Sequence, residues 1–172
     1  MANPTMTLIS AQTLATTAAS VTFSSIPQNY NDLKLMVSAR STFATNFLYL
    51  QYQFNGDSAT NYSYGYLGNY NGSVSTSNTA SDSIVIGNDA SGGSTTANIF
   101  GNSELYIANY KSTGSRQMAI TGASEENSTT LQRVGTAAVL YRGSAAITSI
   151  VASTTASFAA NSTFYLYGIS NT

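Results

Sequence analysis

The stretch FLYLQYQFNGD, residues 47–57, gives the clearest indication of how this chain folds. Its apolar and aromatic side chains recur at every second position, at Leu48, Leu50, Tyr52 and Phe54. Because successive side chains of a strand point to opposite faces, this alternation predicts a β-strand over 47–54 with one buried face. The Asn-Gly pair that follows favours a tight turn, since both residues tolerate positive φ.

Segments of the same kind continue in both directions along the chain. Apolar side chains at period two predict a strand over Asp32–Ala39, and further strands are expected over 5–14, 20–26, 61–70, 84–86, 99–110, 116–122, 131–142, 145–152 and 161–169. Segments rich in Ser, Thr, Asn and Gly are expected to be exposed connections: 73–83, 88–94 and 123–130.

About ten short strands with turns between them are typical of an all-β fold, and we expect an antiparallel, jelly-roll-like β-sandwich. No fixed-period repeat and no linker divides the sequence. Residues 1–172 are therefore expected to form a single β-sandwich domain, with residues 1–6 as an extended N-terminal arm.

The composition supports strands over helices. Hydrophobic residues make up 42% of the chain, which is enough for a core, whereas charged residues make up only 8%. The polarity comes from 26 Ser, 23 Thr and 16 Asn. Ser and Asn compete with the helical backbone for hydrogen bonds, and Thr, Tyr, Val and Ile fit a pleated surface.

The charge pattern excludes two classes of partner. The six basic residues are scattered: Lys34, Arg40, Lys111, Arg116, Arg133 and Arg142. A nucleic-acid-binding protein needs a basic stripe, and an electrostatic membrane binder needs a polybasic run. The chain also has no secretory signal pattern and no apolar run of the ~20 residues that a membrane helix needs. We expect neither nucleic-acid nor membrane partners.

The residue types that carry most catalysis are missing. The chain has no histidine and no cysteine, which removes the commonest general base, the commonest metal ligand and thiolate chemistry. Adjacent Glu125 and Glu126 are interpreted as a solvated loop, and Asp32 as a strand-start residue or ion-pair partner. Asp57 and Asp89 lie in Asn/Gly/Ser-rich segments that resemble calcium turns without completing the pattern. We expect no catalytic site, no metal and no cofactor, and hence no enzyme.

Tyrosine is the most suggestive residue type, with 12 copies and no tryptophan. Tyr62, Tyr64, Tyr66 and Tyr70 fall within one segment, and Tyr provides rigid contact area with a polar tip. They are the candidate interface with other protein chains. Two alternatives stay open: ordinary half-buried strand residues, or a platform that stacks on sugar rings. The N-terminal arm adds further candidate contact residues: Met1, Asn3, Pro4 and Met6.

Four stretches resemble small β-domains of tailed bacteriophages, in proteins described as tail-fibre or virion structural components. They are LISAQTLATTAASVTFSSIP at 8–27, YNDLKLMVSARS at 30–41, FNGDSATNYSY at 54–64 and STFYLYGI at 162–169. The FNGD turn and the terminal FYLYGI are the distinctive parts. The resemblance covers most of the chain, and its motifs are structural.

The resemblance implies a β-sandwich on the outer surface of a virion, made in the host cytoplasm and assembled as a homotrimer. A fibre needs an anchoring domain and a shaft, which a chain interpreted as one domain does not provide. A capsid decoration (cement) protein that binds the major capsid protein and its own copies is therefore expected first. A tail-fibre or tail component that recognises a host surface glycan is the alternative, and a glycan-degrading enzyme is the third.

Overall fold

A computed structural model describes residues 5–125 and 132–170 of the chain. These residues contain no helix and form twelve strands: β1 (Met6–Thr13), β2 (Ala18–Phe23), β3 (Asp32–Ala39), β4 (Phe47–Phe54), β5 (Tyr62–Tyr70), β6 (Ser73–Asp82), β7 (Val85–Ser91), β8 (Gly101–Ile107), β9 (Arg116–Glu125), β10 (Gln132–Tyr141), β11 (Ile150–Phe158) and β12 (Thr163–Ile169). Every named pair of neighbouring strands is antiparallel.

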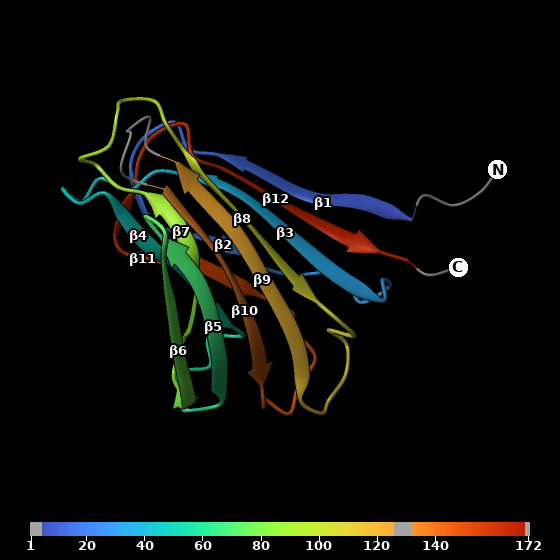
Figure 1. Ribbon diagram of the computed structural model, residues 1–172. Coiled ribbons are helices and arrows are strands. Elements are labelled where there is room, and N and C mark those ends of the chain that lie inside the picture. The colour runs from blue at the N-terminus through green and yellow to red at the C-terminus, as the bar shows by residue number, and fades with distance from the viewer. Residues whose placement is uncertain (1–4, 126–131, 171–172) are drawn as a thin grey trace.

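The strands form two sheets. The larger sheet has eight strands in the order β1-β12-β3-β8-β9-β10-β5-β6, and the smaller has four in the order β2-β11-β4-β7. In Figure 1 the strands of the larger sheet follow one another from β1 at the upper right to β6 at the lower left. Their direction turns steadily along this order, as the right-handed twist of β-strands requires.

The strand order is that of a jelly roll widened on one side. Setting aside the antiparallel pairs β5–β6 and β9–β10 leaves two four-stranded sheets, β1-β12-β3-β8 and β2-β11-β4-β7. With these pairs set aside, the chain crosses between the two sheets after β1, β2, β3, β7, β8 and β11, as in double-sheet jelly rolls. The predicted jelly-roll-like antiparallel sandwich is confirmed, and the two extra pairs broaden one of its sheets.

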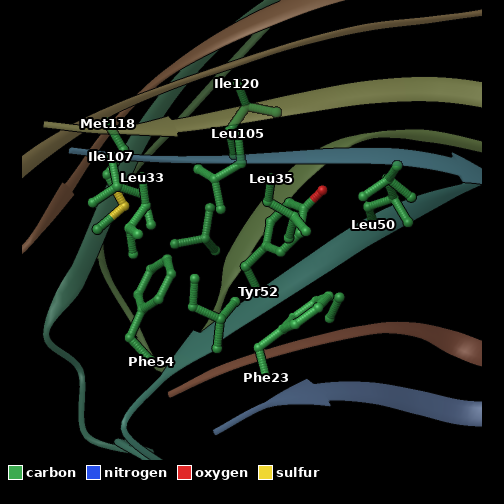
Figure 2. Close-up of a cluster of buried hydrophobic side chains, with 14 of the residues drawn as sticks. Phe23, Leu33, Leu35, Leu50, Tyr52, Phe54, Leu105, Ile107, Met118 and Ile120 are labelled. Atoms are coloured by element: carbon green, nitrogen blue, oxygen red, sulfur yellow. The ribbon is translucent and has the colours of Figure 1, made fainter. Parts of the chain in front are cut away.

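The core lies between the facing sides of the two sheets. In β3 every second residue is buried, as the alternation of its sequence predicts. Figure 2 shows side chains of β2 and β4 pointing toward those of β3, β8 and β9: Phe23, Leu50, Tyr52 and Phe54 on one side, and Leu33, Leu35, Leu105, Ile107, Met118 and Ile120 on the other. All ten are buried.

The structure corrects several expected loops. Residues 73–83 were expected to be an exposed loop, but Ser73–Asp82 forms β6 and pairs with β5. β6 is mostly exposed on both faces, so its sequence lacks the alternation that marks a half-buried strand. The expected connection 88–94 is strand through Ser91, and β9 continues to Glu125 in the expected loop 123–130. Backbone pairing with neighbouring strands, which leaves no local sequence pattern, extends both strands.

β11 differs from expectation at both ends. The strand expected over 145–152 begins at Ile150 and continues to Phe158, beyond a break in its pairing with β2. Residues 145–149 instead form an irregular segment to which the Asn55 side chain is hydrogen-bonded. The Asn55 side-chain oxygen accepts hydrogen bonds from the N–H groups of Thr148 and Ser149 at 2.8 and 3.2 Å.

Candidate interaction surface

The four tyrosines of the predicted interface lie on the side of β5 that faces the smaller sheet. Tyr62 is 0% exposed and belongs to the core, and Tyr64 and Tyr66 are partly buried against it. The ring of Tyr70 contacts that of Phe47 on β4 edge-on, with centroids 5.5 Å apart. The period-two spacing placed them on one face, and the structure identifies that face as the inner one. This arrangement corresponds to the alternative in which the tyrosines are ordinary half-buried strand residues.

Arg133 of β10 explains why so many aromatic residues gather there. Its guanidinium lies over the rings of Phe47, Tyr49 and Tyr70, with centroids 3.7, 5.0 and 5.4 Å away. It donates hydrogen bonds to the hydroxyls of Tyr49 and Tyr66 at 3.1 and 3.4 Å. Arg133 is only 8% exposed, so this cage holds a nearly buried cation and joins β4 to the larger sheet.

A second polar cluster closes the other end of the sandwich. The rings of Tyr62 and Tyr141 stack with centroids 4.8 Å apart, and the Tyr141 hydroxyl donates to Oδ2 of Asp57 at 3.0 Å. Burial, and then this bond, raise the pKa of Tyr141 to about 12. Arg116 lies 4.7 Å from the Tyr141 ring centroid and donates to the carbonyl of Gly143 at 2.7 Å. The cluster links the segment after β4, which contains Asp57, to the segment after β10, which contains Gly143.

Of the candidate contact residues in the N-terminal arm, the structure describes Met6 alone. Met1, Asn3 and Pro4 lie outside the described residues. Met6 is the first residue of β1, where it lies opposite Ile169 of β12 and is 45% exposed. Met6 is therefore part of the larger sheet, whereas it had been assigned to the extended arm.

Asp32 and Asp57 are both engaged in local contacts. Asp32 accepts from the Tyr106 hydroxyl at 2.6 Å and from the Asn109 N–H at 2.7 Å. The side-chain amide of Asn61, the N–H of Ala59 and the hydroxyl of Tyr141 bond to Asp57, and the Asn61 bond is the main reason that its pKa lies below the ordinary value.

The remaining carboxylates of the described residues lie on different strands. Glu104 pairs with Lys34 at 2.8 Å. Asp89 lies in β7 and not in the turn that the sequence indicated. Glu125 is an exposed residue of β9, and Glu126 lies outside the described residues. Within the described residues no three His, Cys, Asp or Glu side chains come together in a group that could hold a metal ion.

A further open surface is the outer face, defined as the side of the larger sheet turned away from the smaller one. Strand registers arrange its side chains over β6, β5, β10, β9 and β8 in three parallel rows: Val74–Asn69–Val134–Ala123–Asn102, Thr76–Leu67–Thr136–Thr121–Glu104 and Asn78–Gly65–Ala138–Ala119–Tyr106. In the third row the small residues Gly65, Ala138 and Ala119 lie between Asn78 and Tyr106, so this part of the face is hollowed.

The hollow consists of adjoining shallow depressions. Three of them, with volumes of about 710, 720 and 470 Å³, extend over β6, β5, β10 and β9. Gly65, Ala119 and Ala138 line their floor, and a fourth of about 310 Å³ continues over β8 and β3 beside Met36. The small side chains at these three positions produce the low floor.

Three exposed hydrophobic residues border the second depression and form what we term the apolar patch. Leu67, Val74 and Val134 are 51%, 71% and 58% exposed and lie in two neighbouring rows. Glu104 is the charged residue of the three rows, and it is paired with Lys34. Exposed apolar side chains with little charge around them are typical of protein–protein contact surfaces.

Comparisons with known proteins add little to this geometry. No protein-family model and no curated protein matches the chain. Among solved structures it is similar to the CBM2 module of the evolved Dit of Lactobacillus casei BL23 phage J-1, at 12% sequence identity and a TM-score of 0.21 over 89% of this chain and 69% of that one. A similarity this low assigns no function. No helix among the described residues has the length and apolar character to cross a membrane.

Proposed function

We propose that this chain is a non-enzymatic structural protein of a tailed-phage virion, and specifically a capsid decoration protein. In this role it binds the major capsid protein and its own copies on the outside of the shell. The observation that carries the proposal is the outer face, with its hollow surface, low charge and the apolar patch of Leu67, Val74 and Val134. The resemblance to tailed-phage virion proteins supplies the setting.

The outer face suits contact with another folded protein. Interfaces are depleted of charge at their centre, and the rows around the apolar patch contain Asn, Thr and Ala with one charged residue. Val74 and Val134 expose apolar surface to water in the free chain. Burial of that surface in a complex is favourable. The same face offers hydroxyl and amide groups that remain hydrated when unbound, which keeps the free chain soluble.

The proposed role is mechanical: the protein stabilises the shell through repeated contacts. A decoration protein gains strength from repetition, because a contact of modest affinity that recurs by symmetry holds many subunits at once. A homotrimer, which the resemblance implies, multiplies each contact in this way. The described polar clusters support a non-enzymatic role: Arg133 and Arg116 pack on aromatic rings, and the Asp32 and Asp57 carboxylates accept hydrogen bonds from neighbouring groups.

The first test is the copy number of this chain in purified virions relative to the major capsid protein. A ratio comparable to that of the capsid protein supports a decoration protein that covers the shell. A few copies per particle would overturn the shell position in favour of a tail component that binds a host receptor. Absence from the particle would overturn both virion roles.

The second test locates the contact. Leu67→Lys places a charge in the apolar patch, and Leu8→Lys is the matched control because Leu8 is 50% exposed on β1, at the opposite edge of the same sheet. Binding to shells that lack this protein is measured by co-sedimentation. The proposal expects weaker binding of the Leu67 variant and unchanged binding of the Leu8 variant; the reverse order would remove the apolar patch from the interface.

A further inference from the structure

The last strand of the larger sheet, β6, has an open edge. It pairs with β5 on one side, and no other described strand lies on its opposite side. Residues 73–78 are all exposed, and the segment 73–80 (SVSTSNTA) contains no charged residue and no proline. Natural proteins usually protect such an edge with lysine, proline or a bulge, because its unpaired N–H and C=O groups can pair with another strand.

The other three edge strands are protected by irregular pairing. The register of β1 shifts between Leu8 and Ser10, and the pairings of β2 and β7 also shift within their short lengths. β6 has a shift as well, but it lies beyond Thr79, where Arg142 donates to the carbonyl of Ala80 at 2.8 Å. Residues 73–79 therefore remain a regular run, longer than the regular runs on the other edges.

We propose that β6 pairs with β6 of a second copy of this chain, antiparallel and around a two-fold axis at Thr76. The regular run 73–79 is symmetric about Thr76, so this register uses its whole length: Ser73 faces Thr79 of the other copy, and Ser75 faces Ser77. The two larger sheets then become one continuous sheet across the dimer. This inference concerns contact between copies and does not depend on the virion role.

The chemistry of the run favours a copy of itself as the partner. An uncharged strand has no electrostatic attraction to a charged partner strand. Two copies of it also have no like-charge repulsion between them. On one face the pairing sets Ser and Thr hydroxyls opposite one another, and Thr–Thr and Thr–Ser pairs are among the favourable cross-strand pairs. On the other face it places Val74 opposite Asn78 of the other copy, which covers part of the most exposed hydrophobic side chain of this sheet.

The first experiment measures the mass of the full chain across a range of concentrations by analytical ultracentrifugation. Thr76→Lys sets two lysines against each other at the axis, and we expect it to raise the dissociation constant about fivefold or more. Thr22→Lys is the control, because Thr22 is likewise an exposed residue of an edge strand, β2. Association that the Thr76 variant weakens and the Thr22 variant leaves unchanged supports the pairing.

A second experiment tests the register. The chain has no cysteine, so single cysteines can be introduced without background. At the axis, residue 76 faces its own copy at a Cα separation of about 4.5 to 5.5 Å, within disulfide range. Thr76→Cys should form a disulfide-linked dimer, whereas Val74→Cys and Asn78→Cys should not. Equal cross-linking at all three positions would indicate random collision and overturn the register.

The outcomes also separate this inference from the proposed function. A monomer at every concentration, or a trimer that Thr76→Lys leaves unchanged, overturns the β6 pairing and leaves the virion role standing. A dimer that Thr76→Lys dissociates supports the pairing, even where the chain is absent from virions. A hexamer that Thr76→Lys splits into trimers supports both the pairing and the expected three-fold contact.

Discussion

The guanidinium of Arg133 on β10 lies 3.7 Å from the ring centroid of Phe47 on β4, and this contact joins the two sheets beyond the apolar core. The larger sheet has eight strands and the smaller one four, and β6 extends past the sandwich with both faces mostly exposed. The aromatic cage around this nearly buried cation holds β5, the partner of β6, against β4 of the smaller sheet.

We expect Arg133→Met to lower the free energy of unfolding by about 1 to 3 kcal/mol, because the variant keeps the aliphatic stem and loses the cation–π contacts and two hydrogen bonds. Urea denaturation followed by tyrosine fluorescence measures this. Arg142→Met is the control, because Arg142 is exposed, and it should change stability by less than about 0.5 kcal/mol. Equal losses in the two variants would refute the role of the cage.

The glycines of β5 should differ in their tolerance of a methyl group. A Cβ at Gly68 would lie 2.0 Å from the Tyr66 hydroxyl, whereas a Cβ at Gly65 meets no atom within 4 Å. Gly68→Ala should displace the Tyr66 ring from Arg133 and cost about 1 to 2 kcal/mol. Gly65→Ala should be neutral or slightly stabilising. Thermal unfolding of both variants tests the difference, and equal melting temperatures would contradict it.

Stability should fall at alkaline pH, partly through Tyr106. The hydrogen bond to Asp32 is the main cause that raises the pKa of Tyr106 to about 12 from its ordinary value of 10.0. The folded chain therefore retains this proton over a range where the unfolded chain loses it, so the free energy of unfolding decreases as the pH rises from 10 toward 12. Tyr106→Phe should make this decrease shallower, as measured by urea denaturation at several pH values. An unchanged slope would show that the bond is not maintained in solution.

Arg40 should control the order of the segment 92–100. Its guanidinium donates to the backbone carbonyls of Gly93, Thr95, Thr96 and Ile99 at 2.8 to 3.2 Å. Lysine keeps the charge but lacks the planar fork that reaches several carbonyls at once. Arg40→Lys should therefore speed proteolytic cleavage within 92–100, detected by mass spectrometry of limited digests. The control Arg142→Lys should be cleaved there at the original rate.

The half-buried strands were the part of the fold that sequence predicts best. The boundaries expected for Asp32–Ala39 and Phe47–Phe54 are those of β3 and β4, because each strand alternates between core and outer residues. The prediction of a loop at 73–83, where β6 lies, was wrong for the complementary reason. Both of its faces are exposed, so the burial that creates a period-two pattern never acts on it, and its pairing with β5 has no signal within the segment.

The candidate surface required the strand register. Leu67, Val74 and Val134 are separated in sequence and look like scattered exposed residues, but three neighbouring strands bring them together. The tyrosines illustrate the opposite case, since their spacing predicts a shared face without indicating whether it points inward. The cage residue Phe47 lies outside the tyrosine segment, so the assignment of that face to the interior depends on packing between sheets.

The pairing of β1 with β12 has a consequence for synthesis. The first strand of the fold cannot find its partner until Thr163–Ile169 has left the ribosome, 150 residues after Thr13. At about 5 to 20 residues per second this leaves β1 unpaired for roughly 8 to 30 seconds. The local pair β5–β6 can form long before then. The nascent chain therefore carries exposed strand edges before the jelly roll can close, and chaperones would meet it in that interval.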